Sequence, residues 1–122
     1  MVRTEHISAE QLDRLMRLRE GHFADLKARE ILPSKLTRTI SAFANADGGE
    51  LYIGVREEAG RSVRRWDGFS DDEAANDCLQ TFERLFPLGQ DFRYEFLEAG
   101  GADGLVLHVA VLKTREIKKA SD

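Results

Sequence analysis

The stretch that decides the fold is Leu36-Thr-Arg-Thr-Ile-Ser-Ala-Phe-Ala-Asn45-Ala-Asp-Gly48-Gly49-Glu-Leu-Tyr-Ile-Gly54-Val55. Its first half carries apolar side chains at helical spacing, and its second half is a short apolar run typical of a buried strand. Between the two halves, Asn45 and the pair Gly48-Gly49 predict a helix end and a turn, because glycine adopts backbone angles that end helices. The stretch therefore predicts a helix that leads directly into a core strand.

Periodicity on either side of this stretch predicts the remaining elements. A helix is expected from the Ser8-Ala-Glu-Gln11 capping box to about Arg19, followed by a strand over 23–29. Residues 50–56 are expected to form one strand, which pairs in a hairpin with residues 63–66. A further helix should run from the Ser70-Asp-Asp-Glu73 capping box to Pro87, before strands over 91–98 and 105–112.

The predicted fold class follows from this order of elements. It is α+β, with a single domain over 1–122 that has a mixed sheet of about five strands and about three packing helices. We expect the core of the domain over about 20–112 and a frayed tail over 113–122.

Composition limits the class of protein. Of the 122 residues, 42% are hydrophobic and 33% are charged, as in ordinary globular domains. No apolar run approaches the ~20 residues that a membrane-spanning helix needs, and the first residues lack the apolar core of a secretory signal. We therefore expect a cytoplasmic protein with no membrane partner. The single Cys78 cannot form an internal disulfide, and it is expected in the core.

The net charge of −4 argues against indiscriminate coating of DNA, because the phosphate backbone favours a basic surface. A local basic face is still compatible with this charge. The side chains that we expect to contact phosphates along one face are Lys27, Arg29, Arg56, Arg64 and Arg65. Trp66 has two interpretations: it stacks on a base beside the arginines, or it covers the sheet.

Acidic residues near the predicted strand over 23–29 also allow metal-dependent cleavage of nucleic acid. Asp25 and Lys27 project to the same side of a strand, as in metal-dependent nucleases in which a carboxylate holds the ion and a lysine steadies the water or the phosphate. The same spacing also occurs on solvated strand faces, so both interpretations stay open. His22 is either a metal ligand or a surface residue, and His108 is expected on a sheet face or in the core.

The segments Ser41-Ala42-Phe43-Ala44-Asn45, Gly48-Gly49 and Leu51-Tyr52-Ile53-Gly54-Val55 resemble the core signature of the Schlafen AlbA-like domain family. The resemblance covers roughly Glu20 to Leu112, and Gly60 and Gly68 also fall where the family places glycines. It implies a nucleic-acid-binding domain whose partner is DNA or RNA.

The resemblance also implies a set of site residues. In the animal Schlafen nucleases, acidic residues at the positions of Glu20, Asp25 and Glu57 are implied ligands of a metal ion, Mn²⁺ or Mg²⁺, in RNA cleavage. Lys27 would contact the phosphate or the attacking water in the same catalytic set. Asp25 stands where the family usually has Glu, and Glu57 where it usually has Asp, so a metal site would shift by about a methylene group.

Three functional hypotheses follow. The first is a nucleic-acid-binding domain that recognises the phosphate backbone with little dependence on sequence. The second is an enzyme, a divalent-metal-dependent endoribonuclease or nuclease that uses Glu20, Asp25 and Glu57. The third is a dimerisation or interaction module of a larger regulator, which would form a homodimer through exposed strand edges.

Overall fold

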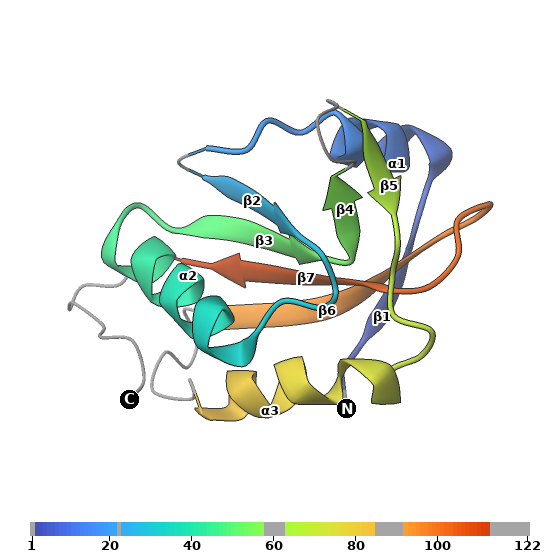
Figure 1. The fold of residues 1–122 in the computed structure, drawn as a ribbon. Coiled ribbons are helices and arrows are strands. Elements are labelled where there is room, and N and C mark those ends of the chain that lie inside the picture. Colours follow the sequence, from blue (N-terminus) through green and yellow to red (C-terminus); the bar gives the residue numbers. More distant parts are fainter. Residues whose placement is uncertain (1, 22, 58–62, 85–91, 113–122) are drawn as a thin grey trace.

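The structure is a computed structural model of the chain, and it describes residues 2–21, 23–57, 63–84 and 92–112. Five strands form one mixed sheet in the order β1-β6-β7-β3-β2 (Figure 1). They are β1 (Thr4–Ile7), β2 (Ala24–Lys27), β3 (Gly49–Ile53), β6 (Phe92–Ala99) and β7 (Val106–Val111). Strands β4 (Val55–Glu57) and β5 (Arg64–Trp66) form a separate two-stranded sheet.

The helices are α1 (Ala9–Met16), α2 (Pro33–Asn45) and α3 (Asn76–Arg84), and a 3-10 turn, η1 (Glu73–Ala75), leads into α3. Helices α2 and α3 lie next to each other on one side of the sheet, whereas α1 lies beside the β4–β5 hairpin (Figure 1). This arrangement confirms the predicted α+β fold class, with its five-stranded mixed sheet and three helices.

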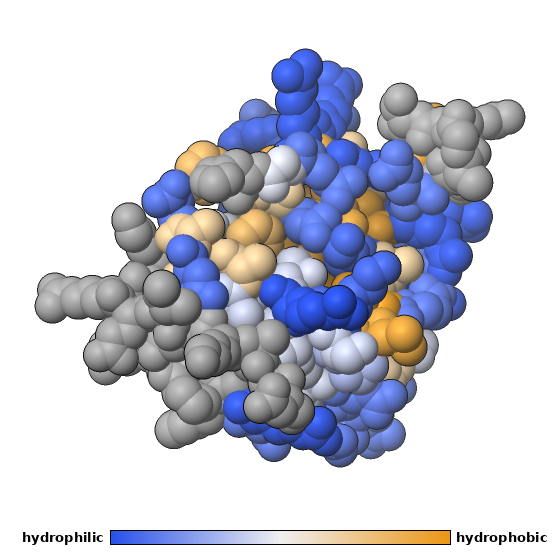
Figure 2. Space-filling model, turned by 60° about the vertical axis from the view of Figure 1, so that its left-hand side comes forward, coloured by the Kyte–Doolittle hydropathy of each residue, from blue (hydrophilic) through white to orange (hydrophobic). Residues whose placement is uncertain are grey.

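Two apolar clusters pack against opposite faces of the sheet. In β7, Leu107 belongs to the cluster under α2 and α3, whereas its neighbour Val106 belongs to the cluster under α1. Because successive strand residues point to opposite faces, this central strand carries apolar side chains on both sides, in keeping with its nearly uniform apolar sequence. On the face shown in Figure 2, hydrophilic residues predominate and hydrophobic ones form small separate areas among them. Cys78 is buried in the cluster under α2 and α3, as expected.

Strand β1 is an element that the sequence did not predict. Only Ile7 is buried among its four residues, so the segment lacks the alternation by which strands are recognised. It pairs in parallel with β6, more than 80 residues later in the chain, so no hairpin turn in the sequence indicates the pairing. The helix after it begins with the predicted capping box, in which Gln11 N–H donates to Ser8 Oγ at 3.1 Å. This helix ends at Met16, earlier than the expected Arg19.

The expectation of one strand over 50–56 is wrong. Gly54 has a φ of 116° and separates β3, in the large sheet, from β4, in the hairpin. Such an angle is rare for any residue except glycine, so the chain bends sharply there. The hairpin itself was predicted and is confirmed by the antiparallel pairing of β4 with β5.

The start of α3 also differs from the expectation. The Ala74 N–H donates to Asp71 Oδ1 at 2.9 Å, so the capping side chain is the carboxylate of Asp71 and not the hydroxyl of Ser70. The buried stripe therefore runs through Ala75, Cys78 and Phe82, while Ala74 is exposed. The expected end of this helix near Pro87, the turn glycine Gly60 and the tail over 113–122 lie outside the described residues.

The close approach of two loops gives a first prediction. A Cβ atom on Gly68 would lie 2.6 Å from the backbone nitrogen of Leu105 and 2.7 Å from its oxygen. We expect Gly68→Ala to lower the free energy of unfolding by about 1–3 kcal/mol, because backbone must move to make room. Urea denaturation measures this loss. Gly21→Ala is the matched control, because its added Cβ has no neighbour within 4 Å; equal stability of both variants would contradict the described packing.

Candidate nucleic-acid interface and acidic edge

The site begins at β2, the last strand of the large sheet. An edge strand leaves alternate N–H and C=O groups without a partner strand. Here the preceding segment satisfies them: the Leu26 N–H donates to Glu20 Oε2 at 3.2 Å, and the Gly21 N–H donates to the Ala24 oxygen at 2.9 Å. Glu20 therefore has a structural role in closing this edge, besides any role in chemistry.

Asp25 and Lys27 project to the same side of β2, as the alternation predicted. Ala24 and Leu26 are buried, whereas Asp25 and Lys27 are half-buried. Lys27 Nζ lies 3.2 Å from Asp25 Oδ2, so the two side chains form an ion pair. The lysine is thereby held beside the carboxylate in the arrangement that both binding and cleavage hypotheses require.

Glu20 and Asp25 meet through their carboxyl groups. The pKa of Glu20 is raised above its ordinary value, first by a side-chain hydrogen bond to Asp25 and next by partial burial. The Leu26 N–H acts in the opposite direction, and the negative charges of Asp25 and Glu57 raise this pKa further. A proton on Glu20 thus relieves the repulsion between neighbouring carboxylates.

The three acidic residues do not form a complete metal site as they stand. Glu20 and Asp25 are in contact, and Glu57 is near enough for its charge to act on Glu20. Within the described part of the chain, however, no group of three His, Cys, Asp or Glu side chains could hold a metal ion. Two carboxylates fit a hard cation, but the third ligand is not in place, so the triad stays a prediction. His22 lies outside the described residues.

Two of the predicted phosphate-contacting arginines belong to a network of four charges. Arg56 donates to Glu30 Oε1 at 2.7 Å and to Asp67 Oδ2 at 3.0 Å. Arg29 lies 3.5 Å from Glu30 Oε2 and 3.8 Å from Asp67 Oδ1, and it also donates to the Gly68 oxygen at 3.2 Å. The hydrogen bond to Asp67 is the main reason that the pKa of Arg56 is raised. The network joins the end of β2 to the hairpin.

Sequence reasoning missed the acidic half of this network. Glu30 and Asp67 are 37 positions apart in the sequence, and each looks there like an isolated surface charge. The predicted hairpin could have indicated one of these contacts, because its second strand brings Asp67 next to Gly54. The Asp67 N–H donates to the Gly54 oxygen at 2.8 Å. The neighbouring Arg56 must then lie near Asp67.

The other predicted basic residues differ in their surroundings. Arg64 donates to the backbone oxygens of Met16 and Leu18, so it satisfies carbonyls at the end of α1. Arg65 is exposed and has no ion pair with another described residue. Trp66 donates to the Gly104 oxygen at 3.1 Å and packs against the cluster under α1, which favours the interpretation that it covers the sheet.

The comparison with protein families agrees with this geometry. A family model described as "Schlafen, AlbA_2" matches residues 20–121. The chain belongs to this family. The match includes Glu20 at the closed edge, helix α2 and the Gly54 break of this AlbA_2 domain, and family membership relates it to nucleic acids. A search of curated proteins finds no match. Among the helices of the described residues, none is long and apolar enough to cross a membrane.

The contact between Glu20 and Asp25 gives a second prediction. Because the pKa of Glu20 is raised, its stabilising contribution is present at acidic pH and is lost as the pH rises through that raised pKa. Glu20→Gln keeps the acceptor for the Leu26 N–H and removes the repulsion. At neutral pH we expect this variant to be at least as stable as the parent and Glu20→Ala to be less stable. The differences should stay within about 1 kcal/mol in this solvent-exposed place.

Urea unfolding at neutral pH and at about pH 4 measures both variants. The advantage of Glu20→Gln over the parent should shrink at the acidic pH, where the parent itself gains the proton. Equal losses for the glutamine and alanine variants at neutral pH would show that the Glu20 carboxylate does not face Asp25.

Proposed function

We propose that this AlbA_2 domain binds nucleic acid through backbone phosphates, with a basic face made of Lys27, Arg29, Arg56 and Arg65. The observation that carries the proposal is the pairing of Arg56 directly opposite Arg65 across the β4–β5 hairpin. Residues that oppose each other in an antiparallel pair project to the same face, so two guanidinium groups share this face of the hairpin. Like charges in this position are unfavourable. Glu30 and Asp67 offset the charge of Arg56, whereas Arg65 has no ion pair with another described residue and is available to a phosphate.

The rest of the basic face joins the same place. Arg29 shares both Glu30 and Asp67 with Arg56, so the two arginines lie side by side. The Lys27 oxygen accepts from the Gly54 N–H at 2.8 Å, which sets the end of β2 against the start of the hairpin. The face therefore combines side chains from two separate segments on one rigid support.

The network sets the strength of binding. About two fifths of the Arg29 and Arg56 side chains are exposed, at 40% and 43%, so a phosphate has access to both. Glu30 and Asp67 hold the guanidinium groups in position, but they also compete with the phosphate for the same N–H groups. Together with the net charge of −4, this predicts modest, strongly salt-dependent binding. Contacts to phosphates carry no sequence information, so binding should be tolerant of sequence.

Removing Arg65 tests the proposal. We expect Arg65→Ala to weaken binding of a fluorescein-labelled single-stranded RNA, because one phosphate contact is lost. The slope of log affinity against log salt should fall in magnitude by about one, as for the release of one counterion. Fluorescence anisotropy titrations at several salt concentrations measure both quantities.

Arg38→Ala is the matched control, because it removes the same charge from an exposed position on α2, outside the proposed face. It should leave the salt slope unchanged. Binding that is absent in the parent, that ignores salt, or that both variants weaken equally would contradict the proposal.

A second candidate function is metal-dependent cleavage of RNA, favoured by the hydrogen-bonded Glu20 and Asp25 carboxyls with the charge of Glu57 nearby. Glu20 and Asp25 would hold Mn²⁺ or Mg²⁺, and Glu57 would have to approach to complete the site. A bound ion there would supply a Lewis acid that polarises the phosphate. Lys27, held beside Asp25, would orient the phosphate.

Cleavage assays with Asp25→Ala test this candidate. If the candidate is correct, labelled single-stranded RNA should be cut by the parent in the presence of Mn²⁺ or Mg²⁺, and the variant should lose at least about 100-fold of this activity. Asp72→Ala, which removes an exposed carboxylate at the start of η1, should cut like the parent. Cleavage that survives Asp25→Ala would indicate a contaminating nuclease. The homodimer and the cytoplasmic location stay predictions.

A further inference from the structure

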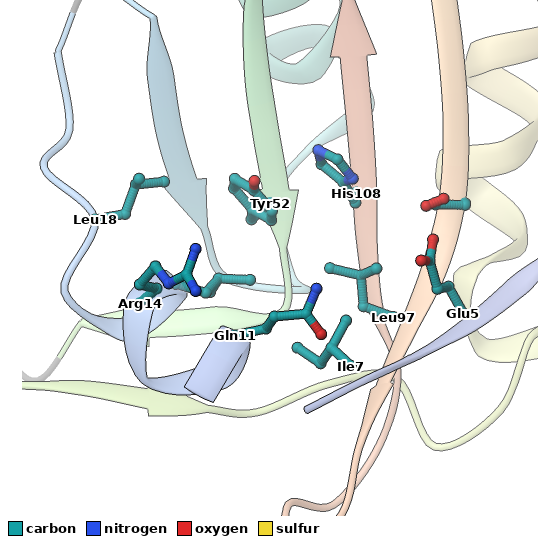
Figure 3. Close-up of a pocket in the computed structure, with 10 residues that line it drawn as sticks. Glu5, Ile7, Gln11, Arg14, Leu18, Tyr52, Leu97 and His108 are labelled. Atoms are coloured by element: carbon teal, nitrogen blue, oxygen red, sulfur yellow. The ribbon is translucent and has the colours of Figure 1, made fainter. Parts of the chain in front are cut away.

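A hollow on the other face of the sheet has no part in the function proposed above. Helix α1 covers only one end of this face, and beside it lies a cavity of about 290 Å³ (Figure 3). Its apolar part comes from Ile7 on β1, Leu15 on α1 and Leu97 on β6. Its volume is near the lower end of the roughly 300–1,000 Å³ of ligand sites, which suits a group of amino-acid size and not a nucleotide.

Two carboxylates stand together on the wall of this cavity. Glu5 comes from β1 and Glu95 from β6, and their side chains are hydrogen-bonded to each other. Burial raises the pKa of Glu95 first, and the hydrogen bond and the charge of Glu5 raise it further, against the opposing charges of His108 and Arg3. Two carboxylates held next to each other beside apolar side chains gain from a cation that lies between them.

The protein already shows which cation this pair accepts. The Arg3 Nη2 atom lies 3.3 Å from Glu5 Oε2 and 3.7 Å from Glu95 Oε2, so one guanidinium group bridges both carboxylates. The Arg3 side chain is nevertheless 76% exposed and reaches the pair from the solvent side. An external group of the same kind therefore has access to the pair from solvent.

The part of the cavity next to Glu95 is aromatic, because His108 pairs with Glu95 and Tyr52 pairs with His108 across neighbouring strands. The rings of Tyr52 and His108 stack with centroids 4.5 Å apart and planes at 4° (Figure 3 shows the two side chains on neighbouring strands). His108 Nε2 lies 3.0 Å from Glu50 Oε1, and burial together with Glu50 raises the pKa of Tyr52 to about 12. These contacts fix the rings in place and add a third carboxylate to the surroundings. Arg14 of α1 also lines the cavity, where its Nη2 atom lies 3.3 Å from Glu10 Oε1. The aromatic rings and the carboxylates favour an aliphatic chain with a cationic end.

We propose that this cavity binds an organic cation, namely an ammonium or guanidinium group on a short aliphatic chain. The charged group takes the place of Arg3 between Glu5 and Glu95, and the chain lies over Ile7 and Leu97. Two sources supply this chemistry: a free diamine or agmatine, and a lysine or arginine side chain of a protein partner. The site lies outside the basic face, so it is independent of nucleic-acid binding.

Titration of the full chain tests the proposal, with agmatine as the free cation and a blocked Gly-Arg-Gly peptide as the side chain of a partner. Isothermal calorimetry at low salt gives the affinities, and NMR of the labelled protein locates the site. We expect saturable binding that shifts the amide signals of β1 and β6. Glu95→Gln should weaken this binding roughly tenfold, because a charge-assisted hydrogen bond is lost.

Arg3→Ala should tighten binding several-fold, because the internal competitor is gone. Its backbone oxygen still accepts from the Phe96 N–H, so β1 stays paired, and damage to the fold cannot produce tighter binding. Glu98→Gln is the control, since Glu98 is an exposed residue of the same strand that faces His6 and not the cavity. It should bind like the parent.

The two ligands distinguish the two sources of the cation. Binding of agmatine alone identifies a small-molecule site, and binding of the peptide alone or of both identifies a site for a partner's side chain. Failure of both ligands, or an affinity that Glu95→Gln and Arg3→Ala leave unchanged, overturns the proposal. Inorganic phosphate that shifts the same amide signals also overturns it, because the site would then prefer anions.

Discussion

The arrangement of charges in this domain depends on the backbone of Gly54. Its N–H donates to the Lys27 oxygen at 2.8 Å, and its oxygen accepts from the Asp67 N–H at 2.8 Å. One residue thus bonds both to the last strand of the large sheet and to the end of the hairpin. Its φ of 116°, and a space of only 3.2 Å between a would-be Cβ and the Gly68 Cα, leave little choice of residue. A side chain here would strain the backbone and press the two loops apart.

The bend at Gly54 brings together charges that are distant in the sequence. It turns Arg56 toward Glu30 and Asp67, and it places Glu57 where its charge acts on Glu20. Basic and acidic groups therefore lie near one edge of the sheet, the first suited to phosphates and the second to a cation. The Glu5–Glu95 pair beside α1 lies on another surface, next to apolar side chains, where it contacts the Arg3 guanidinium group. The domain thus carries two separate charged surfaces: the edge at β2 and the hairpin, and the cavity beside α1.

Sequence reasoning was successful where the signals are local. The helix that ends at Asn45, the turn at Gly48-Gly49 and the alternation of Asp25 with Leu26 follow from signals within a few residues. It failed where a partner is distant: β1 pairs with β6 across most of the chain, and Glu30 meets Arg56 because the end of β2 lies against Gly54. Gly54 within an apolar run was itself a signal of a break, since glycine in a strand often marks a bend. The Glu5–Glu95 pair had no local signal, because two separate strands supply it.

The bend at Gly54 builds the basic face that we propose meets phosphates. The most direct measurement is an NMR titration of the isotope-labelled domain with single-stranded RNA at low salt, in which every amide signal is followed. We expect the signals of Lys27, Arg29, Arg56 and Arg65 to shift together and to return when salt is added. Shifts confined to β1, β6 and α3, or no shift at saturating RNA, would contradict this proposal.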